Sequence, residues 1–388
     1  IKKWYRGGIN STYSLDMIAY SSGACFGGGS EINSGLYHEP DEEFLQKWGD
    51  EYGTKNLSKE SLEPFVKKVE ALTTKQTSEK TLFSSKFEEG ARHSSNEYSY
   101  LPRFLNENGH RNSMSETLLK DYIQRNGKVK LEHEIHKIYY KDKKWFLKSK
   151  DRKTVYSCES LFICCGSVFT NNLLLKSRII NKNKKYLKRF KFHPMIKVIA
   201  SYDEELQEIN DDIAADQNIE FYPKFIIGNA SSSLQFLISS FQKNIFIKEF
   251  IFENWKKMKV FHTTFSLGVG RIYNLPLFKD PILTYYLSKS DKKKLYEGFL
   301  QTMSFIKSTN ATTLIPVKDN LSYNPKENKS DLVINSIKDI KGFQLSSVHI
   351  LGGVTMGENI NCIANSYGKV FDTNGLYVND SSLINTPL

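Results

Sequence analysis

The chain has 388 residues, of which 39% are hydrophobic and 25% charged, and its formal net charge is +11. This length suffices for two domains with a substantial core, and the composition is that of an ordinary globular protein. The sequence has no run of 18 or more apolar residues, so it predicts no transmembrane segment, and it lacks the apolar stretch of a secretory signal at its start.

The positive charge does not predict a nucleic-acid partner. The lysines are spread through short runs at 182–188, 256–259 and 292–294, and none of these runs accompanies a recognisable binding motif. The five cysteines form no disulfide framework, so we expect reduced thiols in a cytoplasmic protein. Cys164 and Cys165 are adjacent within a predicted strand and point to opposite faces of it, so we predict no metal site.

The first distinctive stretch is the small-residue sequence SSGACFGGGSEINSG at 21–35. Gly27 to Ser30 form a loop whose backbone can approach a ligand closely, and we expect a helix to begin directly after it. The amides and the positive dipole end of that helix would face a phosphate. The region 41–75 has apolar residues at near-helical spacing and is also predicted to be helical.

A helix and a set of strands are expected next. The helix covers 113–127, with Ser115 as its N-cap and Asn126-Gly127 as its end. The alternating segments that follow are typical of strands, and the last is expected to be buried on both faces. These segments are 129–140, 145–150 and 154–166.

A strand, a glycine turn and a helix follow one another over 161–180. The helix is indicated by Leu173, Leu174 and Ser177 at helical spacing. The turn of such a unit lies at the carboxyl edge of a parallel sheet, where dinucleotides bind. Because any such turn can carry a glycine, this unit alone indicates binding only weakly.

Between residues 191 and 344 the character of the sequence changes. Segments rich in β-branched and aromatic residues predict an antiparallel sheet, and 291–309 predicts a helix that covers it. The strand segments are 193–202, 219–228, 232–241 and 260–274. We therefore expect this region to form a domain of its own.

The tail again contains turns of small residues. A glycine-broken turn lies at 349–357, and 368–382 predicts a turn at Asn374-Gly375 followed by a strand. Asp380–Ser382 stand where a helix cap belongs. The chain stops at Leu388 without that helix, so the sequence predicts a truncated protein.

Three separated turns thus share small residues that can offer backbone N–H groups to a ligand: Gly27–Ser30, Gly166–Ser167 and Asp380–Ser382. The first resembles a signature of the glucose–methanol–choline (GMC) flavoprotein oxidoreductases. That signature has a Gly-Gly-small-Ser-x-Ile-Asn core, then an aromatic residue and a proline. It stands here as Gly27-Gly28-Gly29-Ser30-Glu31-Ile32-Asn33, Tyr37 and Pro40, with departures from the family preference at Ala24 and Phe26.

The other two turns are similar to two further patterns of this family. The second pattern appears as Gly166-Ser167, Thr170, Leu173-Leu174 and Ser177, with Asn171 in place of a proline and Arg178 in place of a glycine. The tail pattern is matched at His349, Gly352, Met356-Gly357, Leu376-Tyr377-Val378, Asp380 and Ser382. The resemblance therefore covers nearly the whole chain.

The resemblance implies an α/β fold with two domains. A discontinuous Rossmann-like FAD-binding domain, incomplete here, would take 1–190 and the truncated part 345–388. A substrate domain with an antiparallel sheet and covering helices would take 191–344. FAD would be noncovalent, because Ile32 occupies the position at which some relatives carry a flavin-linked histidine.

The resemblance also implies the reaction and its residues. The protein would oxidise a CH–OH group of a small alcohol or sugar by hydride transfer to FAD, with His349 as the general base. The implied cofactor-binding residues are Gly27, Gly28, Gly29, Ser30, Asn33, Ile135, Gly166, Ser167, Asp380 and Ser381. The alternative for Asn33 is a bond to its own backbone, and His193 and His262 are expected to pack on the substrate-domain sheet or line its rim.

Two parts of the family pattern are missing from this sequence. One is the opening unit with G-x-G-x-x-G and an acidic ribose ligand, and the only GxG lies at 268–270, inside the expected substrate domain. The other is a C-terminal segment that supplies a second catalytic residue. Two alternatives therefore stay open: a truncated inactive member that acts at most as a binding protein, and a flavin-containing lyase of the same fold. The sequence predicts neither the substrate nor the electron acceptor.

Overall fold

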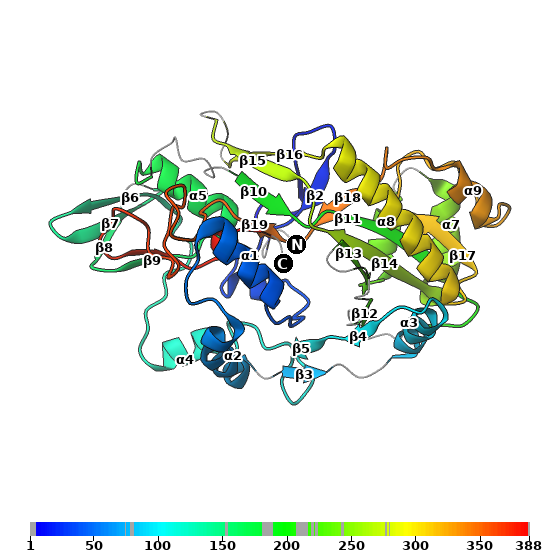
Figure 1. The fold of residues 1–388 in the computed structure, drawn as a ribbon, viewed down its shortest axis with the longest axis horizontal. Coiled ribbons are helices and arrows are strands. Elements are labelled where there is room, and N and C mark those ends of the chain that lie inside the picture. The colour runs from blue at the N-terminus through cyan, green and yellow to red at the C-terminus, as the bar shows by residue number, and fades with distance from the viewer. Residues whose placement is uncertain are drawn as a thin grey trace.

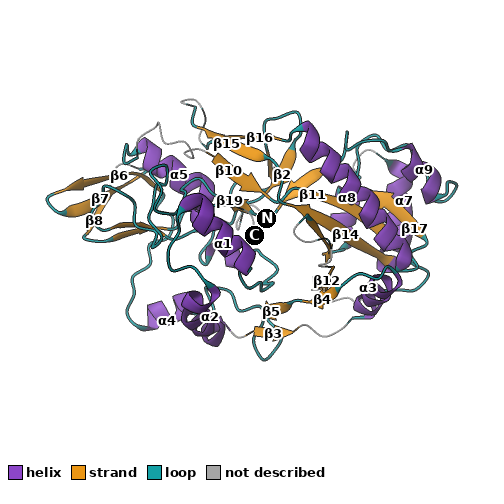
Figure 2. Ribbon diagram, in the orientation of Figure 1, coloured by secondary structure: helices purple, strands orange, loops and turns teal. Residues whose placement is uncertain are grey.

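The computed structural model describes residues 5–73, 75–77, 81–151, 154–180, 189–206, 216–218, 221, 224–241, 244–275, 278 and 280–386. The strands form one large sheet, a four-stranded sheet and three minor ones, with helices around them (Figures 1 and 2). Over these ranges, no helix is long and apolar enough to cross a membrane.

The large sheet has nine strands, in the order β1-β2-β18-β11-β14-β13-β12-β4, with β17 also paired to β11. Neighbouring strands are antiparallel except β2 and β18, which are parallel. The strands are β1 Asn10–Ser11, β2 Ile18–Tyr20, β18 Leu345–Ser347, β11 Met195–Ser201, β14 Met258–Phe265, β13 Phe225–Ala230, β12 Asp216–Asn218, β4 Tyr98–Tyr100 and β17 Thr313–Pro316. The expectation of an antiparallel sheet is confirmed.

The two faces of this sheet pack against different helices. Side chains alternate along each strand, so Val198 of β11 and Phe261 of β14 face one way, into a core shared with α8 (Lys289–Ser308) and α3 (Leu82–His93). Ile199 and Val260 face the other way, against α6 (Leu234–Ser239) and α7 (Ile245–Asn254). The long helix α8 therefore covers the sheet, as expected (Figure 1).

A smaller sheet joins the large one to the rest of the molecule. It has the order β16-β15-β10-β19. Its strands are β16 Ile282–Tyr286, β15 Val269–Tyr273, β10 Arg189–Phe192 and β19 Ile350–Leu351. Because β10 runs directly into the region of β11, and β19 follows β18 closely, both sheets share the segments around residues 193 and 349.

The other end of the molecule contains a second parallel pair of strands. There β9 (Leu161–Ile163) pairs with β20 (Leu376–Val378), and α5 (Gly166–Lys176) follows β9 at once. An antiparallel sheet of β6 (Ile135–Lys141), β7 (Lys144–Ser149) and β8 (Val155–Cys158) lies beside it, at the left of Figure 1. Ile163, Leu174 and Leu376 share a core there.

The remaining elements lie mostly along the outside. They are α1 Glu42–Tyr52, α2 Lys59–Thr73, α4 Leu118–Gln124, α9 Ser330–Ser336, β3 Lys75–Thr77 paired with β5 Pro102–Phe104, and the 3-10 turns η1 Gly28–Glu31, η2 Trp255–Lys257 and η3 Ser381–Leu383. The predicted helical region 41–75 is confirmed as α1 and α2. The large sheet takes strands from residues outside 191–344, and the three domain ranges stay predictions.

Three expectations about local structure were wrong. The segment 232–241 contains the helix α6 rather than a strand, since a short apolar run does not distinguish the two. The strand β9 is not buried on both faces: Phe162 is 61% exposed and stacks on Tyr377 at 4.9 Å. The segment 260–274 is two strands in different sheets, separated by a turn at Gly268.

The helix predicted for 113–127 is shorter than expected and begins at Leu118, with Thr117 rather than Ser115 at its N-cap position. The reason is that the preceding residues bind the small-residue loop instead. The amide of Met114 donates to Ser30 Oγ (2.9 Å), and the amide of Ser115 donates to Glu31 Oε1 (3.2 Å). Of the strand segment 219–228, only 221 and 224–228 belong to the described residues, and the lysine run 182–188 lies outside them.

Candidate active site

The start of α5 is tied to the turn after β20 by one carboxylate. Asp380 Oδ2 accepts hydrogen bonds from the amide of Gly166 (2.9 Å) and from Thr170 Oγ1 (2.5 Å). Asp380 Oδ1 accepts from the amide of Ser382 (2.8 Å). Two of the turns singled out in the sequence therefore lie side by side at the carboxyl ends of β9 and β20, as the strand–turn–helix pattern predicts.

The glycine-broken segment after β18 joins these two turns. Ser167 Oγ donates to the carbonyl of Ile350 (2.8 Å) and lies 3.2 Å from Ser381 Oγ. The amide of Gly352 donates to the carbonyl of Ser381 (2.9 Å), and the Asn171 side chain donates to the carbonyl of Gly353 (2.8 Å). We call these three joined turns, Gly166–Ser167, Ile350–Gly353 and Asp380–Ser382, the α5 cradle.

The small-residue loop does not begin a helix, which corrects the expectation for the residues after Ser30. It forms only the 3-10 turn η1, preceded by Gly27 with φ of 90°. A side chain at Gly27 would collide with that of Glu31, whereas the Cβ positions of Gly28 and Gly29 face open space. The loop can therefore offer its backbone to a ligand, but no helix dipole supports that contact.

Hydrogen bonds hold this loop in place. Ser30 Oγ donates to the carbonyl of Gly27 (2.8 Å), and the Arg111 guanidinium donates to the carbonyls of Glu31 (2.8 Å) and Asn33. Burial alone would raise the pKa of the Glu31 carboxyl, but hydrogen bonds from Ser113, Ser115 and Ser30 outweigh it and lower that pKa. The Asn33 side chain accepts from the amide of Gly35 (3.0 Å), which is the local bond considered as its alternative role.

Arg6 connects the loop region with the α5 cradle. Its amide donates to the carbonyl of Ser22, just before the loop, and its guanidinium lies 4.0 Å from the ring of Phe169 on α5. The same guanidinium pairs with Glu134 (3.1 Å) and Asp280 (2.7 Å). Glu134 directly precedes the half-buried Ile135 at the start of β6, so this arginine brings the loop, α5 and β6 together. No motif in the sequence predicted a role for Arg6.

His349 lies next to the cradle and pairs with a second histidine. The Nδ1 atoms of His349 and His193 are 2.7 Å apart. His193 and His349 are 156 positions apart in sequence. The antiparallel pairing of Phe192 with Ile350 and a hydrogen bond from the His193 amide to Ser347 Oγ (3.1 Å) bring the two segments together. No local motif predicted this pair.

The shared hydrogen bond limits the charge of the pair. Only one of the two Nδ1 atoms can carry the bridging proton, so both rings cannot be imidazolium at once. Burial, together with the nearby His38, lowers the pKa of His349 below its usual value. Burial therefore favours the neutral form of His349, in which one ring nitrogen can accept a proton.

His262 completes a group of four histidines. It lies on β14, where burial lowers its pKa to about 4, with smaller contributions from Lys197 and His349. Its Nδ1 is 2.9 Å from Thr264 Oγ1. His38 and His349 remain exposed to solvent although protein surrounds them closely enough to lower their pKa values. Side chains that are both surrounded and accessible are expected where a protein encloses a small molecule.

The cradle and the loop fit a dinucleotide such as FAD. The Cβ positions of Gly28, Gly29 and Gly166 face open space, which leaves room for a ligand at the backbone. The Ser382 hydroxyl is buried and has no hydrogen-bond partner among the described residues. Ser167, Ser381 and Ser382 would hold the group there, with Gly27–Ser30 opposite.

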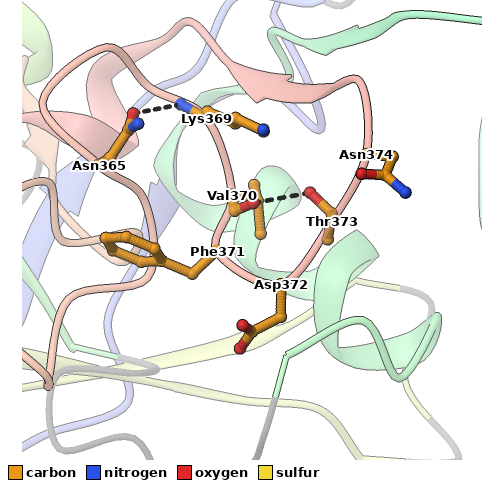
Figure 3. Close-up of a pocket in the computed structure, with 7 residues that line it drawn as sticks. All are labelled: Asn365, Lys369, Val370, Phe371, Asp372, Thr373 and Asn374. Carbon is orange, nitrogen blue, oxygen red and sulfur yellow. Dashed lines mark hydrogen bonds between the residues drawn. The ribbon is translucent and has the colours of Figure 1, made fainter.

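A pocket lined by Asn365 and residues 369–374 does not belong to this site (Figure 3). Its hydrogen bonds are local ones: the amide of Lys369 donates to Asn365 Oδ1 (3.0 Å), and Thr373 Oγ1 donates to the carbonyl of Val370 (2.7 Å). None of the residues predicted for the cofactor or the reaction lines it.

Comparison with known proteins identifies the family of this chain. Family models described as GMC oxidoreductase match residues 4–195 and 276–388. An uncharacterized GMC-type oxidoreductase of Sinorhizobium fredii, y4nJ, is 22% identical over 98% of this chain and 80% of its own length.

Solved structures with the same fold extend the comparison. Pyridoxine 4-oxidase from Mesorbium loti has a TM-score of 0.71 at 10% identity, over 99% of this chain and 84% of that one. An FAD-dependent oxidoreductase from Chaetomium thermophilum has a TM-score of 0.70 at 12% identity, over 99% and 86%. A fungal aryl-alcohol oxidase has a TM-score of 0.65 at 11% identity, over 99% and 85%. With the family models covering most of its length, the chain belongs to the GMC oxidoreductase family.

Proposed function

We propose that the protein oxidises a CH–OH group of a small alcohol or sugar, with noncovalent FAD in the α5 cradle and His349 as the general base. The observation that carries this proposal is the position of His349. It directly precedes Ile350, whose carbonyl accepts the Ser167 hydroxyl, and its ring pairs with His193. A base with a lowered pKa therefore lies beside the residues that fit the cofactor. FAD bound there would supply the acceptor for a hydride.

The histidine pair determines which atom of His349 can act. If His349 Nδ1 donates to His193 Nδ1, the lone pair of His349 Nε2 stays free to accept the proton of a substrate hydroxyl. If His193 is the donor instead, His349 Nε2 carries hydrogen and cannot act as a base. We assign the first arrangement to the reactive state. His193 is then a positioning residue that selects the tautomer.

Ile135 and Asn33 have supporting roles in this proposal. Ile135 begins β6 beside the ion pair of Glu134 with Arg6, so its backbone would meet the adenine end of the cofactor. Asn33 and the loop residues Gly27–Ser30 would approach the cofactor from the opposite side. With Ile32 rather than a histidine before Asn33, no side chain at that position can form a covalent link to the flavin.

The proposal is tested on the purified full chain. Flavin absorbance should be present, and the flavin should leave the protein on acid denaturation. Anaerobic mixing with benzyl alcohol, pyridoxine or glucose should bleach the flavin for at least one of them. Replacing His349 with alanine should keep the flavin bound and slow its reduction by a factor of roughly 10² or more.

Controls separate the alternatives. His110 is exposed and distant from the pair in sequence, so His110→Ala should reduce flavin at the native rate. Protein without flavin would contradict the cofactor assignment. Conversion of an alcohol while the flavin stays oxidised under anaerobic conditions would indicate a lyase instead. Reduction at the native rate in His349→Ala would remove this histidine from the mechanism.

A further inference from the structure

One face of the large sheet carries a lysine in a place where core residues are expected. Lys197 lies in β11, and its side chain points to the same face as Met195 and Ile199, away from the core that α8 covers. Helices α6 and α7 cover this face of the sheet, and Phe236 of α6 lies against Lys197. His262 of β14 is directly opposite it in the register.

Lys197 has no acidic partner among the described residues. Its ammonium group forms neither an ion pair nor a hydrogen bond with a carboxylate there, and it lies 4.7 Å from the centre of the Phe236 ring. Burial lowers the pKa of Lys197 to about 8. A half-buried lysine with no acidic partner among the described residues destabilises the folded state, since burial disfavours its charged form. Its cross-strand neighbour His262 stays neutral near pH 7 and supplies no negative charge.

The surroundings of Lys197 are polar and lead toward His349. Thr264 and His262 lie on the same face of β14, and Ser346 lies opposite Met195, on that face of β18. The Ser346 hydroxyl is buried and has no hydrogen-bond partner among the described residues. His262 is close enough to both Lys197 and His349 for each to affect its pKa. We call Lys197, His262, Thr264 and Ser346 the sheet wall.

Resting on the function proposed above, we infer that Lys197 binds a carboxylate of the substrate. The alcohol that this protein oxidises would then carry its reacting CH–OH group at His349 and a carboxylate at the sheet wall. A hydrogen bond from an ammonium group to a carboxylate is among the stronger contacts in a partly buried site. The lysine therefore determines specificity, and the Ser346 hydroxyl is available for a second bond to the same ligand.

The charge of the wall favours a carboxylate over a phosphate ester. Lys197 is its only cationic residue, because His262 is neutral near pH 7 and Thr264 and Ser346 are uncharged. One ammonium group matches a single negative charge. A phosphate monoester carries nearly two, and proteins usually meet it with an arginine or several amides.

The inference is tested by calorimetric titration of the intact, flavin-loaded protein with ligands that cannot be oxidised as alcohols. The probes are two matched pairs, 4-methylbenzoate with 4-methylbenzamide, and hexanoate with hexanamide. For at least one pair the carboxylate should bind about tenfold or more tightly than the amide. Lys197→Met should abolish that preference, and Lys197→Arg should retain it.

A matched control is Lys318→Met, which removes an equal charge from a lysine that lies near the ring of Phe343, in the core on the opposite face. It should leave the preference unchanged. The inference is overturned if the native protein shows no preference in either pair, or if Lys197→Met keeps it. Because these probes are not oxidised, the result does not depend on turnover. Flavin that is reduced by an alcohol, together with no preference for the carboxylate in either pair, would refute this inference alone.

Discussion

The α5 cradle and the sheet wall lie close together in the fold but are built in opposite ways. The cradle is made of turns with small residues, whose amides and hydroxyls bond one another through Asp380 and Ser167. The wall is made of side chains from separate strands, and it depends on the register of β11 against β14 and β18. A turn built from small residues can be predicted from a short sequence motif. A group of side chains that strand pairing brings together cannot, because its members are far apart in the sequence.

The largest effect on the cradle is expected from a substitution at Asp380. In Asp380→Asn one carboxylate oxygen becomes an NH₂ group that faces an N–H donor, either that of Gly166 or that of Ser382. Leaving a partly buried donor unsatisfied costs about 2 to 3 kcal/mol. We expect the free energy of unfolding in urea to fall by that amount and flavin to be lost from the protein.

The exposed Asp372 provides the matched control for this change. It lies in the same C-terminal region with φ of 57°, a conformation that asparagine adopts readily, and Asp372→Asn should leave both stability and flavin content unchanged. Equal losses in the two variants would show that Asp380 does not hold the cradle together.

The stability of the sheet wall should depend on pH through Lys197. With its pKa lowered from 10.5 to about 8, Lys197 is charged at a cost in the folded state below pH 8. Between pH 8 and 10.5 the folded protein has released this proton while the unfolded chain keeps it, so this residue adds stability as pH rises. The full effect at low pH is about 2 kcal/mol, allowing for partial exposure.

Comparing variants tests whether the stability contribution of Lys197 rises with pH. Lys197→Met should be more stable than the native protein at pH 7, and the difference should shrink toward zero as pH approaches 10. Thermal denaturation of Lys318→Met over the same range controls for the loss of a charge elsewhere. A difference between Lys197→Met and the native protein that stays constant with pH would contradict the burial of this ammonium group.

The smallest loss of stability is expected from a substitution at Phe162, on the outer face of β9. It is 61% exposed and stacks on Tyr377, so Phe162→Thr loses one aromatic pair and little buried area. The expected loss of stability is about 0.5 to 1 kcal/mol, measured by urea denaturation. The comparable change on the buried side of that strand, Ile163→Thr, should cost several times as much.

The sequence predicted the cradle better than the wall. Gly166, Ser167 and Asp380 were identified because each stands in a local pattern of strand, small residue and turn, and the fold class and the family are confirmed. His193 was expected to pack or line a rim, and its pairing with His349 depends on β10 meeting β19. Lys197 was one lysine among many, because burial is not visible in a sequence. The helix expected after Ser30 failed because Glu31 and Ser30 bond the residues before α4 instead.

The position of β18 affects how the chain can fold. Residues 345–347 lie between β2, at residues 18–20, and β11, at residues 195–201. Until β18 is synthesised, the edges of β2 and β11 that it will cover stay unpaired, and unpaired edges of this kind recruit other chains. The large sheet therefore cannot be completed during translation of its first 340 residues. Contacts between residues far apart in sequence form slowly. We therefore expect the nascent chain to require a chaperone until β18 pairs with β2 and β11.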